Sequence, residues 1–384
     1  MEASRFTERA LGRLVEIGTP VSRWAFVPEP LPETWEVPGR LWPLVAEARE
    51  AVGRLDGAGR HMPAHELLLR PLQRREALRS SSMEGTHATP LELLLFELEP
   101  REPRAETDQV NAWREVFNYG RALAAGRKHV DAGYPLSLHL IRSLHRELLT
   151  AVRGSDRHPG EFRTCQVHVG SDARYVPPPP HMLPECLEAL ERALRDLPRT
   201  DPLVRAFMIH YQVEAIHPFA DGNGRVGRLL LSLQIYRDME LHAPWLYLSP
   251  YFERYKDEYV DRLFRVSTHG DWEGWLEFCL RGVVSEANGS LHRIDRLLAL
   301  RQRYQHVAHA ARRGRLHAVI DRLFEFPVVT IPQLARRFRV SYPTAKTDVG
   351  ALVDMGILQE GPIRVRPKVF LAKEIMRISY DADM

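Results

Sequence analysis

The sequence HPFADGNGRVGR, residues 217–228, decides how the chain is interpreted. It places a titratable base, His217, and a carboxylate, Asp221, just before a Gly-Asn-Gly turn, and two arginines follow. Apolar sequence with helical spacing flanks it on both sides, so the turn ends one helix and begins another. The two glycines let the backbone N–H groups turn inward, and the new helix N-terminus adds positive potential. The stretch therefore predicts an anion site of the kind that binds phosphate.

The polar side chains of this stretch suit phosphoryl or nucleotidyl transfer. Arg225 and Arg228 lie near one face at the start of the second helix, and both can fork onto phosphate oxygens. Asp221 can bind Mg²⁺, which prefers carboxylate and phosphate oxygens with water. His217 has a pKa suited to accepting a proton near neutrality. Taken singly, a histidine, a GNG turn or an arginine pair is most often structural, and only their conjunction favours chemistry.

Length and composition indicate a folded protein of more than one unit. At about 150 residues per domain, 384 residues predict two or three units. A hydrophobic content of 44% with 27% charged residues argues against wholesale disorder. The net charge is only +3, so composition does not predict bulk nucleic-acid binding.

Cysteine usage and the absence of long apolar runs bear on the compartment. The three cysteines form no CxxC pair, so neither a disulfide framework nor a zinc site is expected. The N-terminal residues are charged where a signal peptide would be apolar, and no run approaches the ~18 apolar residues of a membrane span. These features predict a soluble, cytoplasmic protein without a membrane partner.

Helical periodicity dominates the chain, and residues 1–40 are expected to form an irregular arm. Apolar spacing predicts helices over 41–55, 65–82, 90–98, 106–125, 136–152, 182–196, 202–216 and 224–239, with a turn at 56–59. Residues 164–169 alternate polar and apolar side chains, which predicts a hairpin with Tyr175 and Val176 and a turn near 171–173. Such a hairpin would be a functional flap or, alternatively, a ribbon that covers a helix end.

The C-terminal part has a different pattern and predicts a winged helix-turn-helix. Its expected elements are helices over 315–325, 331–338 and 341–355 and wing strands at 357–358 and 368–371. Tyr342, Thr344 and Lys346 could meet DNA, and on the preceding segment Arg336, Arg337 and Arg339 would partly compensate for nearby acidic residues. Asp348 and Asp354 would repel phosphates, so DNA binding through 315–371 competes with a packing or dimerisation role, because a fold does not fix a function.

Residues 217–228 resemble the signature of Fic-domain proteins, H-x-F-x-D/E-G-N-G-R-x-x-R, with every specified position matched. Residues 80–85, SSSMEG, resemble the inhibitory motif S/T-x-x-x-E-G/N of the second class of these proteins. Residues 164–170 resemble the target-docking flap, and a winged helix accompanies many bacterial members. The resemblance implies a mainly α fold: a Fic-type helical core with a short β-hairpin flap and a small winged helix-turn-helix domain. The expected divisions are 1–100 for the arm and inhibitory helix, 101–300 for the core and 301–384 for the winged helix.

The resemblance implies a protein adenylyltransferase, which transfers AMP from ATP to a Ser, Thr or Tyr hydroxyl of a target protein or of itself. His217 would be the catalytic base, Asp221 would hold Mg²⁺, and Phe219 would anchor the loop. The target would dock on the 164–176 flap as an added strand. The implied nucleotide contacts are Glu84, Val167, His168, Val169, Gly170, Gly222, Asn223, Gly224, Arg225, Arg228 and Tyr259. The family's Asn and Tyr-Tyr pair near the adenine are absent from residues 253–259, ERYKDEY, which leaves a changed base or donor open.

Glu84 has a plain local interpretation and a sharper implied one. Locally it is an exposed acid at a helix end, before a glycine that suits a positive φ. The resemblance implies an inhibitory motif formed by Ser80, Glu84 and Gly85, in which Glu84 pairs with Arg228 and denies it to the γ-phosphate. Two alternatives stay open: Glu84 positions a water that removes AMP, or the core senses nucleotide in a DNA-binding regulator. A homodimer is also left open.

Overall fold

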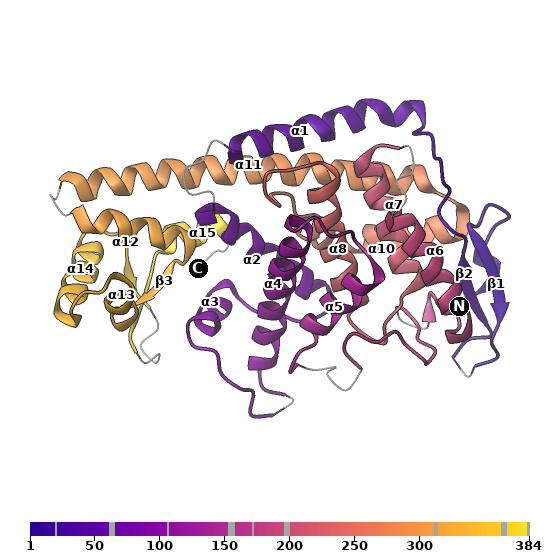
Figure 1. The fold of residues 1–384 in the computed structure, drawn as a ribbon, viewed down its shortest axis with the longest axis horizontal. Coiled ribbons are helices and arrows are strands. Elements are labelled where there is room, and N and C mark those ends of the chain that lie inside the picture. Colours follow the sequence, from indigo (N-terminus) through magenta and orange to yellow (C-terminus); the bar gives the residue numbers. More distant parts are fainter. Residues whose placement is uncertain are drawn as a thin grey trace.

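The computed structural model describes residues 1–19, 21–60, 66–105, 107–152, 158–170, 173–195, 200–310, 314–361 and 367–381. Its helices are α1 (Trp42–Arg60), α2 (Glu66–Met83), α3 (Pro90–Leu98), α4 (Val110–Asp131), α5 (Leu138–Leu148), α6 (Leu183–Arg195), α7 (Pro202–Ile216), α8 (Asn223–Asp238), α9 (Ser249–Arg254), α10 (Lys256–His269), α11 (Trp272–Ala310), α12 (Gly314–Glu325), α13 (Ile331–Phe338), α14 (Tyr342–Asp354) and α15 (Lys373–Tyr380). The strands are β1 (Gly12–Glu16), β2 (Trp24–Pro28), β3 (Val328–Thr330), β4 (Gln359–Glu360) and β5 (Val369–Leu371). The expected mainly α class is confirmed (Figure 1).

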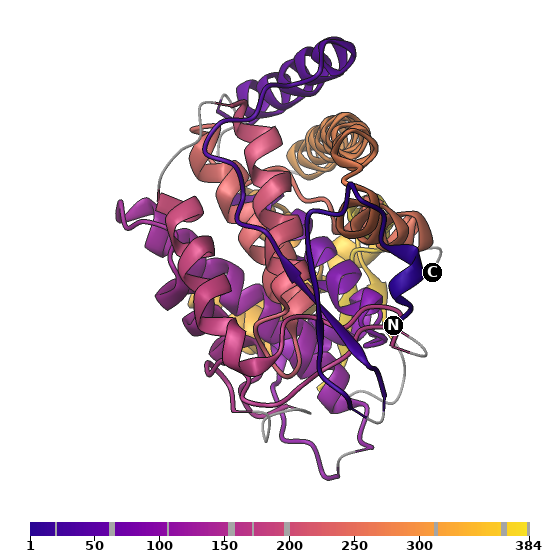
Figure 2. The same cartoon turned by 90° about the vertical axis from the view of Figure 1, so that its right-hand side faces the viewer.

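Helices α7 and α8 pack against each other near the centre of the molecule, and other helices surround them (Figures 1 and 2). Asp201 caps α7: its Oδ1 accepts hydrogen bonds from the backbone N–H groups of Leu203 and Val204, and Pro202 begins the helix. Almost every residue of α7 and α8 is buried, which a single apolar stripe does not predict. The two helices therefore form the rigid support of the loop between them. No helix in the described part of the chain is long and apolar enough to cross a membrane.

Helix α1 corrects one expectation from the sequence. The predicted turn at 56–59 does not form, because α1 continues through it to Arg60. Asp56 accepts hydrogen bonds from Arg60 Nε at 2.9 Å and from the backbone N–H of His242 at 2.7 Å. Gly59 lies against the indole of Trp245, where a Cβ would come within 2.3 Å of the ring. The glycine is therefore used for close packing inside a helix rather than for a turn.

The N-terminal arm is more regular than expected. Strands β1 and β2 form an antiparallel hairpin, seen at the front of Figure 2. In β2, the Phe26 ring packs against Tyr175 with ring centroids 6.0 Å apart, and the Phe26 N–H donates to Val176 O at 2.8 Å. The predicted flap hairpin is reduced, in the described residues, to one antiparallel bridge between Val169 and Tyr175. The expected turn at 171–172 lies outside the described residues.

The C-terminal part continues from the core without a break at 300/301, because α11 runs from Trp272 to Ala310. Beyond it, α12, α13 and α14 pack with a sheet of strand order β3-β5-β4. Strand β3 was not predicted, and the first wing strand lies at Gln359–Glu360 rather than at 357–358. The element order is the one expected for a winged helix, and that assignment stays a prediction.

Candidate nucleotide site between α7 and α8

His217 ends α7 in the left-handed region, with φ of 50°, and its backbone N–H donates to Val213 O at 3.0 Å. Its Nδ1 lies 3.4 Å from the carbonyl oxygen of Glu214, an atom that can only accept a hydrogen bond. Nδ1 therefore carries the proton, and Nε2 keeps its lone pair. Burial, with the nearby Arg163 guanidinium, lowers the pKa of His217 to about 4. The imidazole is neutral at pH 7 and can accept a proton.

The loop after His217 is held by Asn223 and by His145 of α5. Asn223 accepts from the Phe219 N–H and donates to the Phe219 carbonyl, both at 2.8 Å. Its side chain therefore binds the loop itself and does not face the cavity, in contrast to its expected role at the phosphates. Phe219 is fully buried, as expected of an anchor, and stacks on His145 with ring centroids 3.8 Å apart.

His145 was not identified from the sequence, where its only signal is its place on the buried face of a helix. Its Nδ1 accepts from the Gly160 N–H at 2.8 Å, so its Nε2 donates to the Asp221 carbonyl at 3.0 Å. Burial is the main cause that lowers the pKa of His145 to about 4. The neutral His145 thus fixes the position of the Asp221 backbone.

Arg228 and Glu84 meet at the start of α8, across 144 residues of sequence. Arg228 Nη2 donates to Glu84 Oε1 at 2.7 Å, and Arg228 Nε and Nη2 donate to Ser80 Oγ and O, each at 2.9 Å. Burial opposes ionisation of Glu84, but Arg228 outweighs it and lowers the pKa of that carboxyl. Gly85 has a φ of 81°, as expected for the residue after the helix. Ser80 in the last turn of α2 and Glu84 just after the helix therefore both bind the Arg228 guanidinium.

Gly224 makes this pairing possible. A Cβ at Gly224 would lie 2.3 Å from Glu84 Oε1 and 2.8 Å from Arg228 Nη1. Gly222, with φ of 77°, supplies the left-handed N-cap from which α8 starts. The glycines thus serve two purposes: one turns the chain, and the other leaves room for a group beside the helix N-terminus.

Arg225 points away from Arg228. Its Nη1 donates to Glu115 Oε2 of α4 at 3.0 Å, and the same oxygen accepts from Thr86 Oγ1 at 2.7 Å. The Arg225 side chain is 4% exposed and does not line the cavity beside His217. Of the two arginines expected at the phosphates, only Arg228 lines this cavity, and a phosphate contact by either one stays a prediction.

Asp221 lies at the rim of the loop. Its side chain is 51% exposed, and its Oδ1 accepts from the Gly222 N–H at 2.6 Å. No cluster of three or more His, Cys, Asp or Glu side chains suited to a metal occurs in the described ranges. A single exposed carboxylate beside an amide nest fits Mg²⁺ that shares its ligands with phosphate and water, rather than an all-protein cage.

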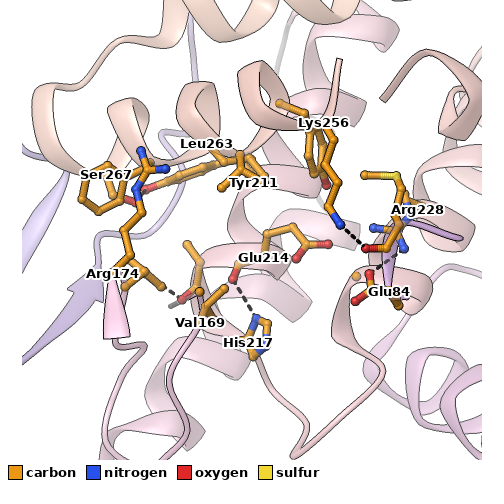
Figure 3. A pocket seen from close by; sticks show the side chains of 18 residues that line it. Glu84, Val169, Arg174, Tyr211, Glu214, His217, Arg228, Lys256, Leu263 and Ser267 are labelled. Carbon is orange, nitrogen blue, oxygen red and sulfur yellow. Dashed lines mark hydrogen bonds and ion pairs between the residues drawn. The ribbon is translucent and has the colours of Figure 1, made fainter. Parts of the chain in front are cut away.

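A cavity of about 210 Å³ opens beside His217 (Figure 3). Its polar end holds Glu84, Glu214, His217 and Arg228, and its other end is built from side chains of α7 and α10 such as Tyr211, Leu263 and Phe264. Of the expected nucleotide contacts, the cavity is lined by Glu84, Val169, Gly170, Gly224, Arg228 and Tyr259. Val167 and His168 instead line a separate depression beside the β1–β2 hairpin.

Glu214 and Lys256 line the cavity and were not identified from the sequence. Burial is the main cause that raises the pKa of Glu214 to about 7, and its Oε1 has no hydrogen-bond partner among the described residues. Gly227 leaves room for this carboxylate, since a Cβ there would lie 2.4 Å from Oε1. Lys256 Nζ donates to the Met83 carbonyl at 2.6 Å and so holds the end of α2.

A neutral histidine, a helix N-terminus that begins with glycines and an arginine thus lie around one cavity in a helical core. Residues 42–128 match the Fic/DOC family N-terminal model, and residues 135–235 match the Fic/DOC family model. The chain belongs to the Fic/DOC family.

Curated relatives are similar over part of their length. Protein adenylyltransferase fic-1 of Caenorhabditis elegans is 38% identical over 104 residues, which cover 27% of this chain and 20% of that protein. Protein adenylyltransferase Fic of Aedes aegypti is 32% identical over 145 residues, or 37% of this chain and 27% of that protein. The chain therefore spans about a fifth to a quarter of the relatives that it matches.

Solved structures share the fold. A Fic family protein from Desulfovibrio desulfuricans superposes with a TM-score of 0.55 at 19% identity, covering 89% of this chain and 98% of that one. Fic-1 from Caenorhabditis elegans superposes with a TM-score of 0.54 at 20% identity, covering 67% of this chain and 74% of that one. The mainly α Fic fold expected from the sequence is thus confirmed.

Proposed function

We propose that the protein is an adenylyltransferase, a nucleotidyltransferase that moves AMP from ATP to a hydroxyl of a target protein or of itself. The observation that carries the proposal is the neutral His217, which lines the same cavity as Arg228 and Gly224 and whose Nδ1 contact with the Glu214 carbonyl leaves Nε2 to accept a proton. Relatives named protein adenylyltransferase support the choice of reaction.

In the proposed reaction, His217 Nε2 takes the proton of a Ser, Thr or Tyr hydroxyl. The hydroxyl oxygen then forms a bond to the α-phosphorus of ATP, the bond from that phosphorus to the bridging oxygen breaks, and pyrophosphate leaves. The Asn223 and Gly224 amides and Arg228 would balance the charge of the phosphates. Asp221 would hold Mg²⁺, which would neutralise phosphate charge when bound. The apolar end of the cavity, with Tyr259, would hold the adenine.

We infer that the described conformation is autoinhibited. Arg228 Nε and Nη2 are engaged by Ser80 and Glu84, and the Glu84 carboxylate fills the space beside Gly224 that a phosphate would use. A γ-phosphate would have to displace Glu84 to reach Arg228. The sequence from Ser80 to Gly85 is then the inhibitory motif.

The bridge between Val169 and Tyr175 supports the proposed target dock on the 164–176 segment. Arg163 donates to the carbonyls of His217 and Cys165, at 2.8 and 3.1 Å, and so ties this segment to the catalytic loop. A target strand could bind beside this segment through main-chain hydrogen bonds, which would bring its hydroxyl toward His217. Such bonds do not depend on the side chains of the target, so they would accept different target sequences.

Incorporation of α-labelled ATP with Mg²⁺ tests the proposal in the purified protein. We expect low self-modification by the wild type, a rise of at least about 10-fold in Glu84→Gly, as loss of one charge-assisted pair allows, and none in Glu84→Gly/His217→Ala. Glu99→Gly, at the exposed end of α3, is the matched control and should behave as the wild type. Equal incorporation by the wild type and Glu84→Gly would contradict the proposed autoinhibition.

The same Glu84 position favours one alternative reaction. The Glu84 carboxylate lies beside Gly224 at the N-terminus of α8, where it could orient a water that removes AMP from a modified target. Release of AMP from pre-modified protein by the wild type, lost in Glu84→Gly, would support removal of AMP over its transfer.

A further inference from the structure

The exposed side of the two helices α13 and α14 carries fewer acidic side chains than the sequence predicts, because Asp348 is buried. Residues 339–341 join them: Arg339 adopts φ of 51°, and Ser341 caps α14 by accepting from the Thr344 N–H at 3.3 Å. Two helices with so short a turn form a helix-turn-helix. Ala345, Val349 and Leu352 face the interior, so the opposite stripe of α14 faces solvent.

Asp348 does not oppose an anionic partner, as the sequence suggested that it would. It is 6% exposed, and Arg315 of α12 donates to both its carboxylate oxygens, at 2.8 and 2.9 Å. The acid is therefore neutralised inside the unit. The acid of α14 that remains exposed is Asp354, at the far end of the helix.

The stripe that faces solvent is basic and open. Tyr342, Lys346 and Gly350 follow one another at intervals of four residues, and Tyr342 is 53% exposed. A Cβ at Gly350 would meet no atom within 4 Å. The exposed cations of α13, the turn and α14 are Arg336, Arg337, Arg339 and Lys346. None of them has an ion pair within 4.0 Å in the described ranges, although Arg337 acts on Glu325 of α12 at longer range. Four such cations in eleven residues stand out in a chain whose net charge is +3.

We propose that this α13–α14 face binds duplex DNA, with α14 in the major groove and the arginines of α13 and the turn on the phosphates. A groove about 12 Å wide admits an α-helix, and Gly350 lets it approach closely. Double-stranded RNA is disfavoured because its major groove is too narrow for side chains to read. An acidic protein is disfavoured because the face offers one tyrosine and little other apolar surface.

Fluorescence anisotropy of the full chain with a labelled mixed-sequence duplex tests this interface independently of any transfer activity. We expect binding that weakens steeply between about 50 and 200 mM salt. Arg336→Ala/Lys346→Ala should weaken it by at least about 10-fold and lower the slope of log K against log salt by up to ~2, about 0.9 per lost phosphate contact.

The control is Arg192→Ala/Arg195→Ala, which removes two exposed arginines from α6 and the same net charge. It should stay within about 2-fold of the wild type, since exposed pairs of this kind contribute little. Three results would overturn the proposal: no binding at low salt, equal losses in the two double variants, or equal affinity for duplex RNA. Unchanged helical circular dichroism shows that each variant is folded.

Discussion

At the scale of single residues, the environment of His217 predicts an unusual pH profile. Its pKa is about 4 rather than the ordinary 6.5, mainly because burial disfavours the charged imidazolium. The neutral base is therefore kept as the pH falls through 6.5 and is lost only as the pH approaches 4. Self-modification by Glu84→Gly should stay nearly constant from pH ~8 to ~5.5. A half-maximal rate near 6.5 would show that His217 titrates normally and is not the buried base described above.

Asn223 gives a second prediction at this scale, because its side chain serves the loop rather than a ligand. Asn223→Ala removes two buried hydrogen bonds to the Phe219 backbone, and we expect unfolding free energy to fall by about 2 kcal/mol. Urea unfolding measures this loss. Asn288→Ala, at an exposed contact with Arg54, is the control and should change stability by less than about 0.5 kcal/mol. Equal stabilities of the two variants would contradict the role given to Asn223.

At the scale of elements, the proposed inhibitory contacts come from the last turn of α2 and the residue that follows the helix. Ser80 and Glu84 lie one turn apart and hold the same guanidinium of Arg228. Ser80→Ala removes one of these contacts, so self-modification should rise above the wild type but stay below that of Glu84→Gly. Arg79→Ala, which loses a partly exposed pair with Glu253, should leave incorporation of labelled ATP unchanged. If incorporation rose to a similar extent in both variants, the cause would be a general weakening of α2, and the contacts of Ser80 and Glu84 with Arg228 would not be inhibitory in themselves.

The elements also show what a sequence can predict. Helices 90–98 and 202–216 were expected with the bounds that they have, because a capping residue and Pro begin each and the apolar spacing is regular. Contacts between segments that are distant in the chain produce no periodic pattern in the local sequence. The sequence gives no sign that Arg225 turns to Glu115 of α4, that Glu214 borders the cavity, or that Trp245 draws Gly59 into a helix. The Glu84–Arg228 pair was expected only from the resemblance, and local sequence favoured an exposed acid.

At the scale of the whole molecule, buried charges join the C-terminal part to the core. Arg75 of α2 donates to Glu286 of α11 at 2.9 Å and to Asp381 at 3.1 Å, and Arg293 of α11 donates to Asp381 at 2.7 Å. Arg75 and Glu286 are 8% and 4% exposed. Since α11 also runs through the expected domain boundary, the two parts share both a helix and an ion network.

This shared network predicts that the chain unfolds in one transition rather than two. Glu286→Ala leaves buried Arg75 with one partner, the half-exposed Asp381, so we expect a loss of about 3–5 kcal/mol that lowers the whole transition. Glu277→Ala removes an exposed pair with Arg281 and should cost less than about 1 kcal/mol. Scanning calorimetry measures both variants. Two separate transitions in the wild type, with only one shifted by Glu286→Ala, would show that the C-terminal part folds on its own, and the network would then be a contact between independent domains.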